Sequence, residues 1–285
     1  IRRRESSAQM KKTIVIGAGI GGLNVAMKLC ETRKVLLIDD RPYAGGRIRT
    51  HRRPEYETGA ARFHSGHKFL LALLSKYGLQ KTKIASKNVF FDKASRKYVE
   101  RAHADLHRTL LFVMSRSSNR PASDLRRITF RDLCEQVLDE NAGHNNLLNV
   151  EEMMEVFGYR CEFELMNAYD ARRSFQRDFS ENVQFFVAVD GLSTLCERMA
   201  DDIRRAGSTG WPFGTGTIEL NRRVVDVYRR EDSETIVVVT DDGQKRTCDD
   251  VVFATKPHQL QRFRILAPVR SLLQSVEAGQ LLRLY

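Results

Sequence analysis

A glycine-rich turn near the start of the chain constrains the fold more than any other part of the sequence. The β-branched run Thr13-Ile-Val-Ile16 predicts a strand, and the apolar spacing from Leu23 to Cys30 predicts a helix. Between them lies Gly17-Ala-Gly19-Ile20-Gly-Gly22, a G-x-G-x-x-G pattern. In this arrangement Gly17 makes the tight turn, Gly19 leaves room for a pyrophosphate, and Gly22 lets the helix pack closely on the strand. The sequence therefore predicts a nucleotide-binding α/β unit, with phosphates at the helix N-terminus.

A second predicted strand ends in carboxylates at the spacing that such a unit requires. Val35-Leu-Leu-Ile38 is followed directly by Asp39 and Asp40, and Asp39 lies 22 residues after Gly17. A carboxylate about 20 residues after the first glycine accepts hydrogen bonds from the hydroxyls of an adenosine ribose. The same negative charge disfavours a 2′-phosphate, so NADP is not expected at this site.

A pair of glycines and an arginine follow the second strand, at Gly45-Gly46-Arg47. Two glycines permit a close backbone approach, and a guanidinium donates two parallel hydrogen bonds to phosphate oxygens. With these residues, the stretch from Val15 to Arg47 resembles the flavin-containing amine oxidase superfamily. That superfamily includes monoamine, polyamine and L-amino-acid oxidases, and protoporphyrinogen oxidase and the carotenoid desaturases are its relatives.

The resemblance implies FAD as the cofactor and extends over the rest of the chain. Glu57-Thr-Gly59-Ala60-Ala-Arg62 is similar to the segment that passes under the flavin, and Ile218 to Val225 is similar to the strand whose valine backbone clasps the adenine. That role falls on Val224, with Val225 as the alternative. The residues that the motif and the resemblance together assign to the cofactor are Gly17, Gly19, Ile20, Gly22, Asp39, Asp40, Gly46, Arg47, Gly59, Ala60, Arg62 and Val224.

The fold class expected is α/β, a Rossmann-like FAD/NAD(P)-binding domain with an inserted, mainly helical substrate domain. Helical patterns between about 104 and 175 support the insertion: Thr129 can cap a helix, and 150–157 and 161–169 read as two more. Strands are expected at 224–228, 235–240 and 251–254, with a turn at Asp241-Asp-Gly243. The expected division is an extension (1–9), a first segment of the FAD-binding domain (10–87), the substrate domain (88–187), a second segment of the FAD-binding domain (188–267) and the start of a second substrate-domain segment (268–285).

The chain departs from the family pattern near its end. If the glycine before the relevant strand is Gly279, Arg283 stands where the family has a lysine that water bridges to the flavin. Arginine stays charged at any working pH, which would disfavour lysine-dependent activation of oxygen. Alternatively, Arg283 is an exposed strand residue. Family members also continue beyond the position of Tyr285, so the sequence is expected to be a fragment of a longer oxidoreductase.

Charge is distributed unevenly along the chain. The total is +11, but residues 1–90 carry 19 basic and 6 acidic side chains, whereas 132–170 carry 1 basic and 10 acidic ones. This asymmetry is not that of a nucleic-acid binder, so no nucleic-acid partner is expected. An acidic insertion would attract a cationic amine or polyamine, although a solvated helix face explains it equally well. The candidate substrate contacts are Glu162, Glu164 and Asp170.

The function predicted is FAD-dependent oxidation of a small-molecule amine. A hydride passes to flavin N5, water hydrolyses the imine, and oxygen or another acceptor reoxidises the flavin. One alternative is a desaturase-like or protoporphyrinogen-oxidase-like enzyme, and another is a non-catalytic flavin-binding module or fragment. The substrate and the oligomeric state cannot be read from the sequence.

The cysteines and the apolar runs bear on location. Five cysteines are scattered without a C-x-x-C pair, which favours a reducing compartment, and a cytoplasmic protein is expected. No apolar run approaches the roughly 20 residues that span a bilayer, so the visible chain predicts no membrane segment. His64 and His67 lack a third ligand at metal-site spacing, and no metal is predicted.

Overall fold

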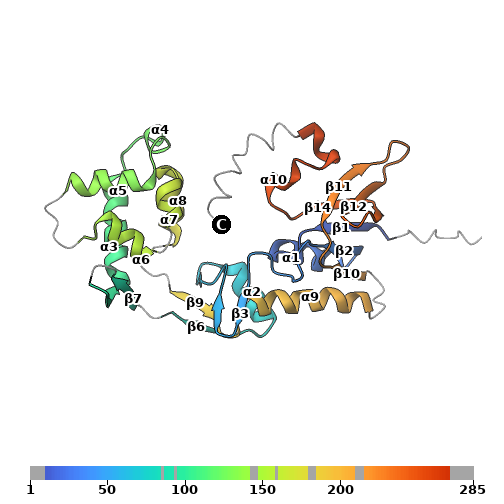
Figure 1. Ribbon diagram of the computed structural model, residues 1–285, viewed down its shortest axis with the longest axis horizontal. Helices are drawn as coiled ribbons and strands as arrows, with labels where there is room; N and C mark the ends of the chain where they lie inside the picture. The colour runs from blue at the N-terminus through green and yellow to red at the C-terminus, as the bar shows by residue number, and fades with distance from the viewer. Residues whose placement is uncertain are drawn as a thin grey trace, which may run out of the picture. The chain divides into compact units, whose positions relative to one another are not determined.

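The computed structural model describes residues 10–84, 87–92, 95–141, 147–157, 160–178, 184–208 and 215–269. The chain forms two compact units (Figure 1). Unit 1 comprises Ile1–Phe63, His67–Thr82 and Val187–Ala278, and unit 2 comprises His64–Gly66, Lys83–Phe186 and Gly279–Tyr285. Each unit is therefore built from segments that are distant in the sequence.

A parallel sheet forms the centre of unit 1. Its strands are β1 (Lys12–Ile16), β2 (Lys34–Ile38), β10 (Thr215–Glu219) and β14 (Asp250–Phe253), in the order β10-β2-β1-β14. The register pairs Ile14 with Leu36 on one side and with Val251 on the other. Helix α1 (Ile20–Leu29) follows β1, and α9 (Ser193–Ser208) precedes β10. The strands and the helix expected around the glycine-rich turn are confirmed, and the fold is α/β with a Rossmann-like sheet.

An antiparallel sheet shares its core with the parallel one. Its strands β11 (Val224–Arg229), β12 (Ile236–Thr240) and β13 (Lys245–Cys248) follow one another in sequence order. Gly243 has a φ of +78° in the turn between β12 and β13, which confirms the turn expected there. Ile14 and Ile38 of the parallel sheet belong to the same buried cluster as Val227 and Val238. Helix α10 (Pro257–Leu260) and the 3₁₀ helix η1 (Arg264–Val269) come next along the chain.

Short elements complete unit 1 and carry the chain into unit 2. Strands β3 (Thr50–Arg52) and β4 (Glu55–Glu57) form an antiparallel hairpin, and α2 (Lys68–Lys76) follows it. Strands β5 (Phe63–His64), β6 (Lys81–Lys83) and β9 (Phe185–Ala188) pair in the order β5-β9-β6. The chain passes from one unit to the other within these three strands.

Unit 2 is mainly helical, although it contains a hairpin, β7–β8, that the sequence did not predict. Phe130, Phe163 and Phe175 lie at the centre of its core, with ring centroids of Phe130 and Phe163 5.0 Å apart. Its elements are β7 (Lys87–Asp92), β8 (Lys97–Ala102), α3 (His103–Arg116), α4 (Ala122–Leu125), α5 (Phe130–Asp139), α6 (Val150–Phe157), α7 (Arg160–Leu165) and α8 (Ala168–Asp178).

Helix α5 begins as the sequence predicts. The Thr129 hydroxyl accepts a hydrogen bond from the Asp132 amide at 3.1 Å, and the Asp132 carboxylate accepts one from the Thr129 amide at 2.9 Å. This reciprocal pair satisfies two backbone donors that the first helical turn leaves free.

The helix expected at 161–169 is wrong, because the chain breaks there into α7 and α8. The Phe130 amide donates to the Met166 carbonyl at 3.0 Å, and the Ala168 amide donates to the Ile128 carbonyl at 2.9 Å. The Asn167 side chain then accepts from the Asp170 amide at 2.9 Å. Asparagine competes with helical backbone bonds in this way and starts a new helix instead.

Within the described residues, no helix combines the length and the apolar character that crossing a bilayer requires.

Candidate cofactor-binding site

The glycine-rich turn lies at the carboxyl edge of the parallel sheet. The Gly17 amide donates to the Ile38 carbonyl at 2.8 Å, and Gly17 has a φ of +109°. A Cβ at this position would lie 2.6 Å from the Ala254 carbonyl oxygen, so a larger residue would be both strained and obstructed. Strand β1 has β2 on one side and β14 on the other, so the turn lies where the strand order reverses. In open α/β sheets this reversal point is where nucleotides bind.

The other two motif glycines face different surroundings. A Cβ on Gly22 would lie 1.9 Å from the Gly17 carbonyl oxygen, so this glycine is needed for close packing of α1. A Cβ on Gly19 would meet no atom within 4 Å. Gly19 is also the N-cap of α1, and Ile20 is the first helical residue. The N-terminus of α1 therefore presents backbone amides beside an open space, which is the arrangement that binds phosphate.

Asp39 links the end of β2 to the glycine-rich turn. Its carboxylate accepts hydrogen bonds from the Ala18 amide at 2.6 Å and from the Arg41 amide at 2.9 Å. Burial raises the pKa of Asp39, while these two amides oppose the rise and the neighbouring Asp40 carboxylate adds to it. Asp40 itself is exposed. Asp39 is therefore the carboxylate that the backbone holds beside the open space at Gly19.

Gly45 and Gly46 lie against the same turn. The Gly45 amide donates to the Ala18 carbonyl at 2.8 Å, and both glycines have left-handed φ values of +121° and +62°. A Cβ on Gly46 would approach the Gly19 Cα to 3.1 Å. Arg47 follows directly and is exposed. The structure thus brings two glycine segments into contact that lie 26 residues apart, as the predicted site requires.

The Gly59–Ala60 segment continues this surface. A Cβ on Gly59 would lie 1.6 Å from the Arg47 carbonyl oxygen, and the Ala60 amide is 3.3 Å from the same oxygen. Arg62 is exposed two residues later. Among the assigned positions, Gly19, Gly46, Arg47 and Gly59 therefore form one connected backbone surface.

The two valine candidates for adenine differ in their backbone environment. The Arg222 amide donates to the Asp39 carbonyl at 2.9 Å, which places the start of β11 near Asp39. Val224 is buried, and its carbonyl accepts from the Arg262 guanidinium at 3.0 Å. Val224 pairs with Thr240 and Asp226 pairs with Val239, so Val225 is the extra residue of a β-bulge. Val225 is 40% exposed. Bulge residues leave backbone groups outside the ladder, so Val225 stays in consideration beside Val224.

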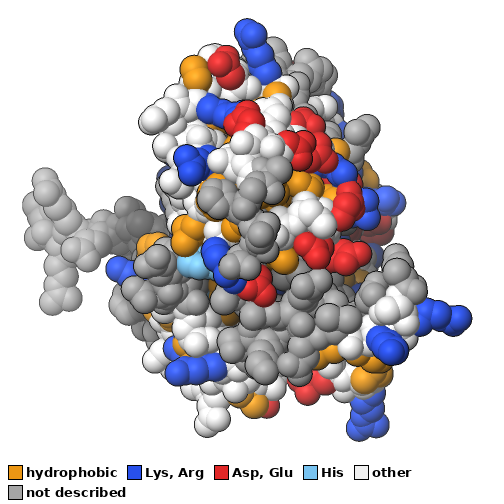
Figure 2. Space-filling view, turned by 90° about the vertical axis from the view of Figure 1, so that its left-hand side faces the viewer, with side chains coloured by type: hydrophobic (Ala, Val, Ile, Leu, Met, Phe, Trp, Pro, Cys, Tyr) orange, Lys and Arg blue, Asp and Glu red, His pale blue; other side chains and the backbone are white. Residues whose placement is uncertain are grey.

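The carboxylates proposed to contact substrate lie in unit 2, and two of them already have basic or amide partners. Glu164 is 2.9 Å from the Arg160 guanidinium and 3.7 Å from that of Arg131. Asp170 accepts from the Asn167 amide group at 2.8 Å and lies 3.9 Å from Arg126. Figure 2 shows basic side chains beside many of the carboxylates on the face in view. Glu162 is half-buried in the first turn of α7.

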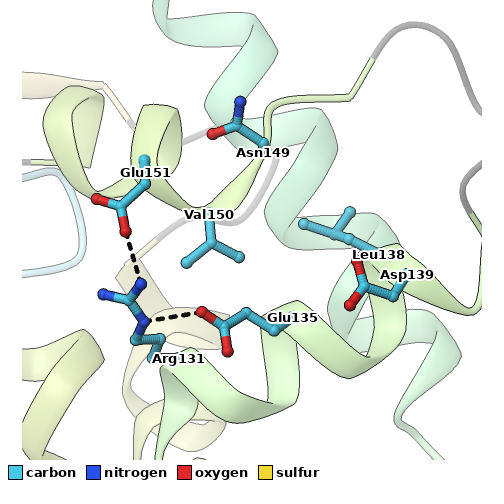
Figure 3. Close-up of a pocket in the computed structure, with 7 residues that line it drawn as sticks. All are labelled: Arg131, Glu135, Leu138, Asp139, Asn149, Val150 and Glu151. Carbon is cyan, nitrogen blue, oxygen red and sulfur yellow. Dashed lines mark hydrogen bonds and ion pairs between the residues drawn. The ribbon is translucent and has the colours of Figure 1, made fainter.

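A hollow of about 330 Å³ opens elsewhere in unit 2 (Figure 3). Arg131 donates hydrogen bonds to Glu135 at 2.8 Å and to Glu151 at 2.6 Å at its edge. The residues that line it are Arg131, Glu135, Leu138, Asp139, Asn149, Val150 and Glu151. The three predicted substrate carboxylates are not in this lining, so the structure does not bring them together there.

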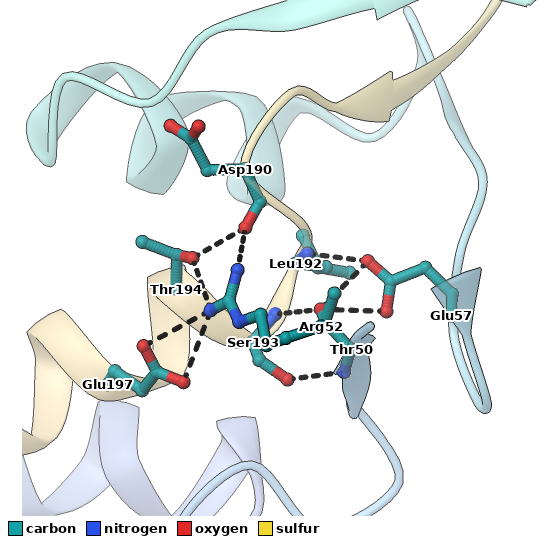
Figure 4. A network of polar contacts seen from close by, with 8 residues as sticks. All are labelled: Thr50, Arg52, Glu57, Asp190, Leu192, Ser193, Thr194 and Glu197. Carbon is teal, nitrogen blue, oxygen red and sulfur yellow. Dashed lines mark hydrogen bonds and ion pairs between the residues drawn. The ribbon is translucent and has the colours of Figure 1, made fainter. Parts of the chain in front are cut away.

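A polar network that sequence reasoning missed joins the β3–β4 hairpin to the start of α9 (Figure 4). The Thr50 amide donates to the Ser193 hydroxyl at 2.7 Å, and the Ser193 amide donates to the Thr50 hydroxyl at 3.1 Å. Glu57 accepts from the Thr50 hydroxyl at 3.0 Å and from the Leu192 amide at 2.6 Å. These partners lie as far as 143 positions apart, and no local pattern announces them.

A buried hydroxyl at the reversal point has no partner among the described residues. Thr255 follows β14, and its Oγ1 is the buried side-chain atom left without a hydrogen bond in this part of the chain. Its Cγ2 would lie 3.3 Å from a Cβ on Gly17. A buried hydroxyl left without a hydrogen bond costs about 1–3 kcal/mol.

Arg283 lies outside the described residues, as does most of the segment expected at 268–285.

Comparisons with known proteins bear on this site. The model of a family described as flavin containing amine oxidoreductase matches residues 20–284. The L-amino acid oxidase of Cerastes cerastes is 28% identical over 109 residues, which cover 35% of this chain and 21% of that protein. The L-amino-acid oxidase of Vipera ammodytes ammodytes is 29% identical over 109 residues, or 35% of this chain and 22% of that protein.

A solved structure of putrescine oxidase bound to putrescine resembles this chain with a TM-score of 0.62 and 18% identity. The likeness covers 90% of this chain and 60% of that one, so it shows a shared fold. The matched region spans about a fifth of the curated relatives, and the chain spans less than two thirds of the solved one.

Proposed function

Since this chain belongs to the flavin-containing amine oxidoreductase family, we propose that unit 1 binds FAD and that the protein it belongs to oxidises an amine. One observation carries the proposal: the open space at Gly19 lies where the strand order reverses, with Asp39 and Gly46 beside it. An α1 N-terminus, a carboxylate and a second glycine pair are the groups that hold a dinucleotide at such a point.

Each portion of the cofactor has candidate partners on this surface. We assign the ribose of the adenosine to Asp39, whose carboxylate has acceptor sites beyond the two that backbone amides occupy. The pyrophosphate falls to the amides at Gly19 and Ile20, with Gly46 and Arg47 beside them. Gly59, Ala60 and Arg62 then extend toward the ribityl chain and ring, and Val224 or Val225 contacts the adenine.

The residues of this chain would bind and orient the reactants. When bound, FAD would supply the acceptor for the two electrons that are removed when the amine is oxidised to an imine. Glycines at the contact surface let the backbone approach closely, and Arg47 offers a fixed fork of donors. Because Gly17 and Gly22 are held by close backbone packing, the surface is formed in advance and loses little freedom on binding.

A cationic amine is the substrate class that the charge distribution supports. Residues 132–170 carry ten acidic side chains and one basic side chain. Arginines from neighbouring segments pair with several of these acids, among them Glu164 and Asp170. We therefore propose that, of the three carboxylates, Glu162 contributes most to the attraction of a cationic substrate, because the charges of Glu164 and Asp170 are partly offset by their arginine partners. The putrescine in the solved structure of the similar oxidase is a diamine, which supports the same class for this chain.

The first test is an absorption spectrum of the protein after addition of FAD, followed by anaerobic bleaching with a diamine and with a neutral amine analogue. We expect flavin bands that bleach on addition of a diamine. Glu162→Gln should raise the KM for the diamine about fivefold, since a charge pair near a protein surface is worth about 1 kcal/mol or more. Glu155→Gln, an exposed carboxylate of α6, is the matched control and should change little. Equal effects on charged and neutral substrates would reject the electrostatic role.

A further inference from the structure

A reciprocal pair of hydrogen bonds anchors the β3–β4 hairpin to α9. The Thr50 amide donates to the Ser193 hydroxyl, and the Ser193 amide donates back to the Thr50 hydroxyl. Thr50 and Ser193 are 9% and 8% exposed, so water competes little for these bonds. Buried hydroxyl–amide pairs are costly to break, because each partner is left unsatisfied.

The Glu57 carboxylate completes this arrangement. The Thr50 hydroxyl has one proton and already accepts from Ser193, so it donates to Glu57, which also accepts from the Leu192 amide. Glu57 thus places a negative charge at the N-terminus of the sixteen-residue helix α9, where the helix dipole favours it. We name Thr50, Glu57, Leu192 and Ser193 the hydroxyl–carboxylate cluster.

A glycine permits the close approach on which the cluster depends. A Cβ on Gly191 would lie 2.3 Å from the Thr50 Cγ2 and 2.4 Å from its Oγ1, and Gly191 has a φ of +71°. A side chain at that position would displace Thr50 from Ser193. The local backbone is therefore arranged to admit this one hydroxyl.

The cluster holds both ends of the segment that lies beside the cofactor surface. Thr50 lies three residues after Arg47, and Glu57 lies two residues before Gly59. Between the cluster and these residues, the Thr58 amide donates to the Arg49 carbonyl at 2.9 Å. Gly59 then packs on the Arg47 carbonyl. A shift of Glu57 would therefore be transmitted through Thr58 to the Gly59–Ala60 segment.

Helix α9 also contacts the glycine pair of the site. A Cβ on Gly45 would lie 3.4 Å from the Cβ of Cys196, which is in the first turn of α9. The same helical turn thus touches Gly45 and, through Ser193, Thr50. It fixes two cofactor segments against one rigid element.

We propose that the hydroxyl–carboxylate cluster positions the Gly59–Ala60 segment for the flavin half of FAD, an inference that rests on the proposed function. Thr50 and Glu57 are positioning residues, since they act through the backbone of the neighbouring segments. The adenosine half is held by Asp39 and the α1 N-terminus, which lie outside the cluster's own hydrogen bonds. The cluster therefore governs affinity for FAD more than affinity for ADP.

Arg52 lies beside the cluster (Figure 4) and serves as an internal comparison. It donates to the Asp190 carbonyl at 2.6 Å and to the Thr194 hydroxyl at 3.0 Å, and it lies 3.4 Å from Glu197. Its side chain is 47% exposed, so its ion pair is worth little. Removing Arg52 should therefore change FAD affinity less than removing the Thr50 hydroxyl.

The experiment titrates apoprotein with FAD and separately with ADP, using flavin fluorescence and calorimetry, for wild type, Thr50→Val and Thr50→Ser. Thr13→Val is the matched control, because Thr13 is a buried threonine of the same unit whose hydroxyl accepts from Arg33 at 3.1 Å. We expect Thr50→Val to weaken FAD binding about tenfold and ADP binding less than about twofold. Thr50→Ser should restore FAD binding, and Thr13→Val should lower only the thermal stability.

Each other outcome overturns the proposal. If Thr50→Val and Thr13→Val change FAD affinity equally, the cluster has only a structural role. If FAD and ADP affinities fall together, the cluster does not act on the flavin half. Should Thr50→Val fail to fold, Glu57→Gln tests the same split between the two ligands. If wild type binds neither ligand, the proposed function itself is refuted. If it binds ADP as tightly as FAD, only the positioning role is refuted.

Discussion

Substitutions at Gly19 and Gly22 should separate the role of the glycine-rich turn in cofactor binding from its role in folding. Replacing Gly19 by alanine adds a methyl group that meets no protein atom within 4 Å, and the φ of −67° at Gly19 suits an alanine. The apoprotein should therefore keep its stability to within about 1 kcal/mol, because alanine restricts the unfolded chain but is a poorer N-cap residue than glycine. The same methyl group would occupy the space proposed for the pyrophosphate.

The expected loss of affinity follows from the surroundings of that space. Gly46 packs against Gly19, since a Cβ on Gly46 would lie 3.1 Å from the Gly19 Cα. The backbone at Gly19 therefore cannot move away from the pyrophosphate without displacing Gly45 and Gly46. We expect FAD binding to weaken by at least tenfold, or about 1.4 kcal/mol. Gly22→Ala should act in the opposite way. Its methyl group would lie 1.9 Å from a backbone oxygen, an overlap that should cost about 3 kcal/mol or more of unfolding free energy.

Gly21→Ala is the control for both changes, since its methyl group would also meet nothing within 4 Å and Gly21 is exposed on the first turn of α1. The assay combines urea unfolding of each apoprotein with titration by FAD. Gly21→Ala should preserve both quantities, Gly19→Ala should lose affinity alone, and Gly22→Ala should lose stability. Full FAD affinity in Gly19→Ala would refute the placement of the pyrophosphate, and a stable Gly22→Ala would refute the packing argument.

Two further outcomes follow from groups whose pKa is raised by burial. The pKa of Asp39 is higher in the folded protein than in the unfolded chain, so wild type should lose unfolding free energy relative to Asp39→Asn as the pH rises through that pKa. FAD binding should strengthen over the same range, because the ionised carboxylate accepts hydrogen bonds from the ribose. Urea midpoints and FAD titrations between about pH 4 and pH 7 measure both quantities, and FAD binding that does not change with pH would contradict this role of Asp39. Burial raises the pKa of Cys30 and Cys248 to about 11 and that of Cys196 to about 12. A thiol reagent at pH 7 should therefore modify the half-exposed Cys161 well before these three cysteines. Rapid reaction of several thiols in the native protein would contradict their burial.

The elements that the sequence predicted well are those specified by neighbouring residues. Strand β1, the turn at Gly17 and helix α1 occupy consecutive positions, and each residue type has a local reason for its place. The Thr129 cap of α5 likewise depends on a partner three residues away. Local patterns of this kind survive folding because the tertiary structure agrees with them.

The errors arose where a distant segment changed the outcome. The apolar spacing of 161–169 suits a helix, but Met166 pairs with the first residue of α5, Ala168 pairs with the backbone just before α5, and Asn167 starts a new helix. Sequence periodicity carries no information about that pairing. The hydroxyl–carboxylate cluster is a stronger case, because its hydrogen bonds join residues 135 and 143 positions apart. Thr50 and Ser193 are ordinary residues in the sequence, and only the folded backbone gives them a shared role.

The acidic block shows how a charge count along the sequence can overstate an electrostatic field. Residues 132–170 contain one basic side chain, but Arg131 lies just before them and contacts Glu135, Glu151 and Glu164. A single guanidinium outside the counted window thus offsets charge on three helices inside it. The attraction for a cation therefore depends on carboxylates that no arginine reaches, and neutralising Glu164 would disturb the Arg131 contacts as well as any substrate. For this reason Glu162→Gln is a cleaner probe of substrate charge than a change at either of the other two candidates.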